Sequence, residues 1–540
     1  MLSAAENHVN KFQISNFKFQ KHKKVSNWRL IIKVIGILLF IESGLLLTCF
    51  IMGIIYEEPE RYAFLWPMII AWAIGVANQY IGRNSSSNMS RKDGYMIVTV
   101  VWLVFTVIGM LPFLFSGTVP DVASAFFETM SGFTSTGATI MDDCGALPKC
   151  IIFWRSVTQW IGGVGIIFFT VAILPAFGVG EVKLFAAEST GPFRNKVHPR
   201  ISITAKWIGT IYLLLTLGCI TSLICCGMGT FDAINYSFTI TATGGYAPHS
   251  ELISDYFQSP TIEYVMIIFM ILSGINYTLL YFAIIKGHFR NFFRDGELRC
   301  FFIIFGGATI ICTAILTANK ILDDNFDTST FSAFCTGLEL SFRDSLFTVV
   351  SLQTTTGLAN CDYTLWPMPC MPLLLFIMFA GACSGSTSSG FKCVRWSLIY
   401  RITRNEFKHI LHPRAVLPVK YNGQIVNHQI MRTLFGFTAL FVGALLIGAF
   451  ILAFSGVDPQ EIVAHSDFRP DIDFDFYDAL GLSMSSISNV GPGMEYYGPA
   501  HSWSILSPFA KYTCSFLMLI GRLEIFPVLV LFTRSFWRKT

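Results

Sequence analysis

The chain has 540 residues, of which 53% are hydrophobic and only 13% are charged. Soluble domains carry a charged fraction of about 25%, so this composition excludes an ordinary soluble protein. The net charge of +4 gives no indication of a nucleic-acid partner. We therefore expect membrane lipid to surround most of the chain.

Long apolar windows recur from one end of the chain to the other. A window of 18 or more apolar residues can cross about 30 Å of hydrocarbon, so we expect about ten spanning segments. The eighth window is short and looks broken, and the first is too long for a cleaved signal peptide. The windows are 30–56, 62–81, 94–115, 161–177, 207–228, 262–285, 301–318, 371–382, 434–454 and 509–532.

Positive charge is concentrated in alternate loops between these windows. Lys and Arg gather before the first window, in the segment 392–414 and at the C-terminus, whereas the intervening loops contain "YEEPE", "MDD" and "LDDNFD". The positive-inside rule then places both termini in the cytoplasm. The acidic outer loops would concentrate cations at the outer side. Cysteines in these outer loops, such as Cys144 and Cys150, are placed where a disulfide is permitted.

One stretch of small polar residues, "FETMSGFTSTGAT" at 127–139, interrupts the apolar pattern. A solvated turn would explain a single copy. However, similar stretches follow at 235–247 ("NYSFTITATGGYA"), 347–359 ("FTVVSLQTTTGLA") and 482–494 ("LSMSSISNVGPGM"). We align their glycines as Gly137, Gly244, Gly357 and Gly491. Four similar loops, each after a short helix, predict a ring around a pseudo-fourfold axis.

The expected fold is an all-α integral membrane protein with four repeats of span, pore helix, filter loop and span around one pore, preceded by two extra spans. Non-helical backbone at membrane depth must be buried or line a water-filled path. Glycine permits unusual dihedral angles, so carbonyl groups can face one axis and replace the hydration shell of potassium. We expect Asn489 and Val490 of the diverged fourth loop to contribute backbone only. The predicted filter residues are Ser135, Thr136, Gly137, Ala242, Thr243, Gly244, Thr355, Thr356, Gly357, Asn489, Val490 and Gly491.

These patterns divide the chain into seven parts. They are a basic cytoplasmic N-terminus (1–29), two extra spans (30–82), pore repeats one (94–180), two (204–286) and three (300–395), a cytoplasmic linker (396–429) and pore repeat four (430–540).

The run "GACSGSTSSG" at 381–390 contains almost no residue that favours a membrane helix. Small residues can serve close helix packing, but packing needs them only at every fourth position. We therefore expect an unwound intramembrane loop that obstructs the pore. Arg522 follows the apolar run of the last window, where a buried arginine usually faces a cavity or a carboxylate. A structural pair with Glu524, or a place near the membrane edge, agrees equally well with the sequence. The predicted gate residues are Gly381, Ser384, Gly385, Ser386, Thr387, Gly390 and Arg522.

Together with "QWIGGVG" (159–165), "AESTGP" (187–192), "AGACSGSTSSGFK" (380–392) and "GRLEIFPVLVLF" (521–532), the four loops resemble the TrkH branch of the Trk/Ktr/HKT superfamily of potassium transporters. The resemblance covers essentially the whole chain. It implies potassium uptake across the bacterial inner membrane by a homodimer, with a TrkA-like cytoplasmic subunit that binds nucleotide. It also places Arg522 in the pore below the filter. Gly137 stands where some plant relatives carry the serine that admits sodium, which argues for potassium.

Other functions are less consistent with the sequence. A sodium- or proton-coupled symporter of the same superfamily remains open. A secondary transporter of another substrate would show twofold repeats with a site at the midplane. An intramembrane enzyme would need a catalytic constellation within the spans, and none is present, so we do not expect an enzyme. The chain also has no P-loop and no strand-associated GxGxxG, so any nucleotide site would lie on another subunit.

Overall fold

The computed structural model describes residues 27–85, 90–168, 201–287, 289–322, 331–415, 417–455 and 474–538. The described chain is helical apart from loops and one antiparallel hairpin, β1 (Lys420–Tyr421) and β2 (Gln424–Ile425). Six of its helices are long and apolar enough to span a membrane, and two bent helix pairs pass the same test. The prediction of an all-α integral membrane protein is thereby confirmed. The window 161–177 continues beyond the described residues.

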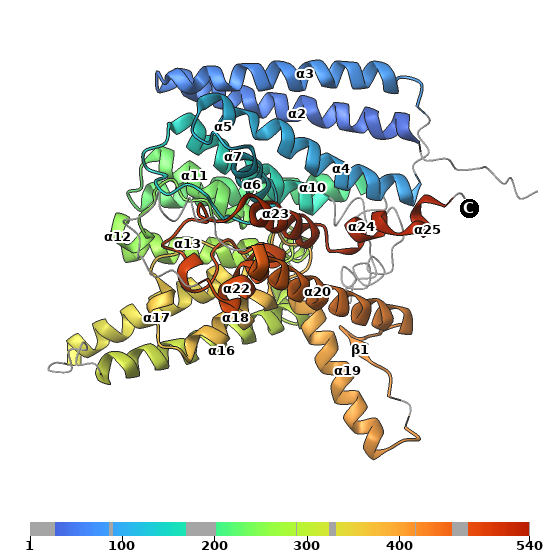
Figure 1. Ribbon diagram of the computed structural model, residues 1–540. Coiled ribbons are helices and arrows are strands. Elements are labelled where there is room, and N and C mark those ends of the chain that lie inside the picture. The colour runs from blue at the N-terminus through green and yellow to red at the C-terminus, as the bar shows by residue number, and fades with distance from the viewer. Residues whose placement is uncertain are drawn as a thin grey trace, which may run out of the picture.

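Two helices at the start, α2 (Trp28–Ile55) and α3 (Tyr62–Gly82), pack against each other along one side of the molecule (Figure 1). Small residues allow this close approach, since a Cβ added to Gly75 would lie 2.9 Å from the Phe40 ring. These helices are the two extra spans that the sequence predicts.

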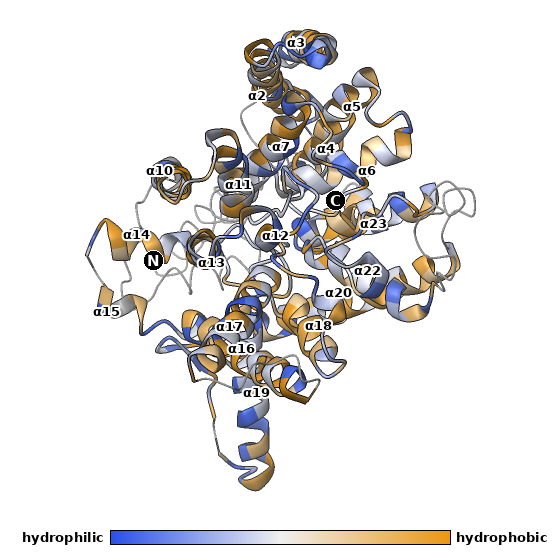
Figure 2. Ribbon diagram, turned by 90° about the vertical axis from the view of Figure 1, so that its left-hand side faces the viewer, coloured by the Kyte–Doolittle hydropathy of each residue, from blue (hydrophilic) through white to orange (hydrophobic). Residues whose placement is uncertain are grey.

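The remaining helices form four groups around a common centre, which is visible when the molecule is turned by 90° (Figure 2). Each group supplies a helix that ends near this centre and then a loop. The first two groups contain α4 (Arg91–Gly109), α5 (Leu111–Ser116), α6 (Val122–Phe133) and α7 (Lys149–Phe168), then α10 (Ile201–Cys225), α11 (Thr230–Ala242), α12 (Ile253–Phe257), α13 (Pro260–Gly274) and α14 (Tyr277–Ile284). The third and fourth contain α16 (Gly296–Leu322), α17 (Phe331–Gln353) and α18 (Cys370–Ala380), then α20 (His428–Ser455), α22 (Phe476–Ser488), α23 (Pro508–Arg522) and α24 (Phe526–Leu529).

The pore helices α6 and α22 begin at acidic caps. The Asp121 carboxylate accepts a hydrogen bond from the Ser124 amide, and Asp475 forms a capping box with Asp478. Such caps satisfy amide groups that the first helical turn leaves unpaired. The pore helix of the third repeat, α17, is 23 residues long rather than half-length. It packs along α16, and the two helices extend together beyond the rest of the fold (Figure 1).

Breaks occur where the sequence shows small-residue interruptions. Helices α13 and α14 meet at an angle of 106°, and the helix pair around "GRLEIF" is bent by 112°. At the first break the Asn276 side chain accepts hydrogen bonds from the amides of Thr278 and Leu279 and so starts the new helix. At the second, Glu524 and Ile525 adopt φ angles of 57° and 61°. Both breaks thus have a local cause.

After a non-helical segment, the third repeat continues into α19 (Cys393–Leu411), which projects from the body and leads to the hairpin (Figure 1). Its start is held by buried ion pairs. The Glu524 carboxylate binds Lys392 Nζ at 2.6 Å and the Arg395 guanidinium at 3.0 Å. The projecting helix is therefore attached to the fourth repeat at its base.

Candidate ion pathway

The four loops share one backbone conformation. In each loop two residues, separated by one position, have positive φ angles. The first has a φ of 51° to 55° and the second, always glycine, a φ of 78° to 108°. These angles align the loops residue by residue without reference to sequence. The aligned pairs are Ser135/Gly137, Thr243/Gly245, Thr355/Gly357 and Asn489/Gly491.

This alignment corrects the prediction for the second loop. Gly245, not Gly244, occupies the position of Gly137, and Ala242 is the last residue of helix α11. Two adjacent glycines left the register of the sequence alignment ambiguous, and only the backbone angles resolve it. The second loop therefore consists of Thr243, Gly244 and Gly245.

The aligned glycines close a ring. A Cβ added to any of the four would lie no more than 2.6 Å from a carbonyl oxygen of the next loop, closer than real Cβ contacts allow. Each loop therefore contacts its neighbour through a position that no side chain can occupy, and the fourth loop returns to the first. The contacts run from Gly137 to Gly244, from Gly245 to Thr356, from Gly357 to Val490 and from Gly491 to Thr136.

Threonine hydroxyls hold the first and third loops. The hydroxyls of Thr134 and Thr136 lie 2.8 Å apart, and those of Thr354 and Thr356 are also 2.8 Å apart. Thr134 and Thr354 each donate a further hydrogen bond to a carbonyl of the preceding helix. These two loops therefore have the same internal bracing.

The second and fourth loops have no such threonine pair and are held by carboxamides. Gln159 of α7 donates from Nε2 to the Gly244 carbonyl at 2.7 Å and accepts from the Tyr246 amide at 3.1 Å. In the fourth loop Asn489 donates from Nδ2 to Thr136 Oγ1 at 2.8 Å and to the Met518 carbonyl at 3.0 Å. The expectation that Asn489 contributes backbone alone is therefore wrong. Gln159 was not among the predicted site residues, although it begins the "QWIGGVG" motif.

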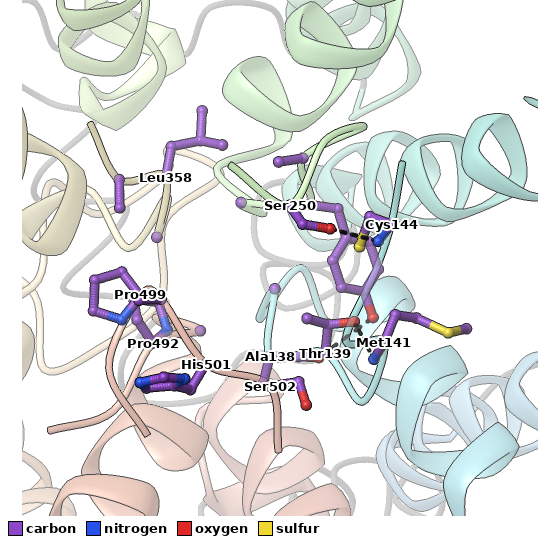
Figure 3. A pocket seen from close by; sticks show the side chains of 18 of the residues that line it. Ala138, Thr139, Met141, Cys144, Ser250, Leu358, Pro492, Pro499, His501 and Ser502 are labelled. Carbon is purple, nitrogen blue, oxygen red and sulfur yellow. Dashed lines mark hydrogen bonds between the residues drawn. The ribbon is translucent and has the colours of Figure 1, made fainter. Parts of the chain in front are cut away.

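A cavity of about 120 Å³ lies against the face of the ring that carries the four aligned glycines (Figure 3). Residues from all four repeats line it. Asp142 and Glu251 contribute acidic groups to its lining. A buried ion pair supports its wall, with Arg155 Nε 2.9 Å from Glu128 Oε1. Arg155 also donates to the Ala247 carbonyl of the second repeat at 3.2 Å. The sequence analysis did not identify this pair. The feature that could have revealed it is the presence of two oppositely charged residues, Glu128 and Arg155, in mainly apolar segments of the same repeat.

Against the face of the ring that carries Thr355, residues 381–392 form a buried, non-helical loop with turns. This conformation agrees with the unwound form and not with a packing face. The loop touches the ring directly, because the Ser389 amide donates to Thr355 Oγ1 at 3.0 Å. The Thr387 hydroxyl donates to the Ser273 carbonyl at 3.2 Å, and the Ser384 amide to Glu297 Oε1 at 2.5 Å. We call residues 381–392 the intramembrane loop.

Arg522 is buried between the intramembrane loop and the first repeat. One guanidinium nitrogen donates to the Thr387 carbonyl at 2.8 Å and to Ser389 Oγ at 3.1 Å. The other donates to Ser135 Oγ and to the Gly162 carbonyl, both at 3.1 Å. Arg522 therefore bridges the loop to the ring, while Glu524 binds Lys392 and Arg395.

The chain is similar to known proteins over nearly its whole length. A family model described as "TrkH: Cation transport protein" matches residues 61–539. The chain is 34% identical over 517 residues to the Trk system potassium uptake protein TrkH of Salmonella typhimurium, covering 95% of this chain and 100% of that protein. It is 32% identical over 516 residues to the Trk system potassium uptake protein TrkG of Escherichia coli, covering 95% of this chain and 99% of that protein. The crystal structure of the potassium transporter TrkH from Vibrio parahaemolyticus superimposes with a TM-score of 0.81 at 31% identity, covering 95% of this chain and 100% of that chain. The chain therefore belongs to the TrkH family of cation transport proteins.

Proposed function

We propose that this protein takes up potassium across the bacterial inner membrane through the ring formed by its four loops. The observation that carries the proposal is the closed contact of each loop glycine with a carbonyl of the next loop. Carbonyl oxygens gathered around one axis can replace the hydration shell of a potassium ion. The names of the relatives, which describe potassium uptake, support the choice of ion.

In this proposal the filter consists of the three consecutive residues of each loop that end at the ring glycine. Their carbonyls bind the passing ion, and the side chains hold the backbone in place. Ala242 is replaced in the filter by Gly245. The filter residues are then Ser135, Thr136, Gly137, Thr243, Gly244, Gly245, Thr355, Thr356, Gly357, Asn489, Val490 and Gly491.

The intramembrane loop and Arg522 act as the gate. The loop lies against the inner side of the ring, and a buried guanidinium there opposes a cation by charge. A polar, glycine-containing loop can change conformation if water or neighbouring groups satisfy its backbone. The gate residues are Gly381, Ser384, Gly385, Ser386, Thr387, Gly390 and Arg522.

Regulation comes from a TrkA-like cytoplasmic subunit that binds nucleotide, and the protein works as a homodimer with both termini in the cytoplasm.

A continuous series of hydrogen bonds from the hairpin to the intramembrane loop supports a route for this regulation. Asn422 of the hairpin donates to Asp295 Oδ2 at 2.9 Å and accepts from the Gly296 amide at 3.0 Å. The next residue, Glu297, binds the intramembrane loop at Ser384. A partner that moves the hairpin would thus act on the gate.

The filter is tested by Gly137→Ser and Gly357→Ser. Each serine would place Cβ against a carbonyl oxygen at a φ that L-residues rarely adopt, so we expect a lower potassium/sodium preference. Preference is measured as the ratio of ion fluxes in liposomes, and uptake as growth of a potassium-uptake-deficient bacterial host at low potassium. Gly443→Ser, at a helix position with open space around it, is the matched control. An unchanged preference in both filter variants, with normal membrane insertion, would remove the filter assignment.

A further inference from the structure

The loops alternate around the ring in how they are held. The first and third, which are opposite one another, use threonine pairs, whereas the second and fourth use the carboxamides of Gln159 and Asn489. We propose that Gln159 and Asn489 are positioning residues that fix the carbonyl geometry of the second and fourth loops and so set the potassium preference. This inference rests on the proposed filter function.

Gln159 fits against the second loop at a position shaped to receive it. Its side chain is fully buried, and its amide holds the Gly244 carbonyl and the Tyr246 amide at once. A Cβ added to Gly244 would lie 2.5 Å from Gln159 Oε1, so a side chain there would displace the carboxamide. The two adjacent glycines therefore have different tasks. Gly245 closes the ring, and Gly244 admits Gln159.

Asn489 links the fourth loop to two neighbours. Its φ of 55° lies in the left-handed region, which asparagine tolerates better than most residues. From this backbone its Nδ2 reaches Thr136 in the first loop and the Met518 carbonyl in helix α23. The bond to Thr136 joins the fourth loop to the first at the residue whose carbonyl faces Gly491.

The chemistry of the carboxamide suits this position. The N–H groups of a carboxamide donate hydrogen bonds that hold the acceptor oxygen in one orientation, as those of a lysine or arginine would. Unlike lysine or arginine, they add no charge close to the ion path. A carboxylate would accept hydrogen bonds but could not donate to a carbonyl. Losing the donor leaves a buried carbonyl without that bond, which costs free energy and lets the loop relax. A relaxed loop no longer distinguishes potassium from sodium by its geometry.

The test uses Gln159→Met, which keeps side-chain length without the donor, and Asn489→Gly, which keeps the positive φ without the amide. The control is Asn235→Ala, a buried carboxamide on α11 that donates to the Phe231 carbonyl of its own helix. We expect the potassium/sodium flux ratio in liposomes to fall roughly tenfold in both test variants, because each loses the two buried hydrogen bonds of its carboxamide. The control should keep the wild-type ratio.

A second measurement separates positioning from general stability. Potassium bound in the filter stabilises the folded protein, so the melting temperature should be higher in potassium than in sodium. We expect both test variants to lose this difference, because their melting temperature falls more in potassium than in sodium.

Three outcomes would overturn the inference. The first is a wild-type flux ratio in both test variants while Gly137→Ser lowers it, in which case the proposed filter stands. The second is an equal loss of preference in Asn235→Ala. The third is a fall in melting temperature in both salts without a change in their difference. If the ratio is unchanged in Gly137→Ser and Gly357→Ser as well, the proposed function itself fails.

Discussion

Arg522 makes four hydrogen bonds at 2.8 to 3.1 Å, two to the intramembrane loop and two to the first repeat. Its guanidinium presents several donors in a rigid plane, so one side chain can bridge two segments. Lysine carries the same charge on a single nitrogen and cannot reproduce this bridge. The residue therefore offers a way to separate the effect of charge from the effect of bridging.

We predict that Arg522→Ala raises potassium flux by roughly tenfold or more, because charge-assisted hydrogen bonds of about 1.5–3 kcal/mol would no longer hold the loop closed. Arg522→Lys should give an intermediate flux, since the positive charge remains. Flux into liposomes measures both. Arg83→Ala, at an exposed position at the end of α3, is the control. Wild-type flux in both Arg522 variants would place the gate elsewhere.

At the scale of elements, the intramembrane loop is held by hydrogen bonds at both ends. The Cys383 amide donates to the Gly274 carbonyl at 3.1 Å, and the Cys393 amide to the Ala382 carbonyl at 2.9 Å. Between them, Glu297 accepts from the Ser384 amide. A segment held mainly through such bonds can be released without repacking a helix interface.

Removing residues 386–388 should raise potassium flux and make it less dependent on nucleotide in the presence of the partner subunit, because the shortened loop cannot reach Arg522. Glu297→Ala, which keeps the chain length, should act in the same direction by releasing Ser384. Flux is compared with and without nucleotide. Glu60→Ala, in the turn η1 (Pro59–Arg61), is the control. If both test variants insert normally and keep wild-type regulation, the segment is packing rather than a gate.

The base of α19 depends on one carboxylate shared by two cations. Glu524→Gln would remove the carboxylate charge that pairs with the buried Lys392 and Arg395. Breaking a buried pair in this way costs about 3–5 kcal/mol, so we predict a clearly lower free energy of unfolding. Denaturant unfolding in detergent measures it, with Glu406→Gln at an exposed position of α19 as control. Equal stability of the two variants would contradict the prediction.

At the scale of the whole molecule, orientation can be tested by cysteine labelling. All fourteen cysteines are free, and Cys144 and Cys150 are buried, so they are poor reporters. The exposed Cys225 and Cys335 lie near the ends of helices that we place on the outer side. In variants that retain one cysteine each, we predict labelling of these two by an impermeant reagent from outside. A cysteine at the exposed Tyr400 of α19 should react only from the cytoplasm. The reverse pattern would invert the orientation.

Much of the architecture could be predicted because it depends on chemistry that repeats in the chain. Four stretches of small polar residues stand out against apolar spans, and each corresponds to a loop with the same backbone angles. The loop at 381–390 was predictable because a helix does not form readily from glycine and serine. The length of α17 was not predictable from its own residues, because it depends on packing along α16.

The sequence by itself determined the membrane setting, the four repeats and the unwound loop, since hydropathy and composition act locally. The tertiary structure alone decided the register of the second loop, where backbone angles choose Gly245 over Gly244. It also decided that Gln159 and Asn489 hold opposite loops, and that Glu524 binds Lys392 and Arg395. These are contacts between residues 29 to 353 positions apart, and only the fold brings such residues within hydrogen-bonding distance.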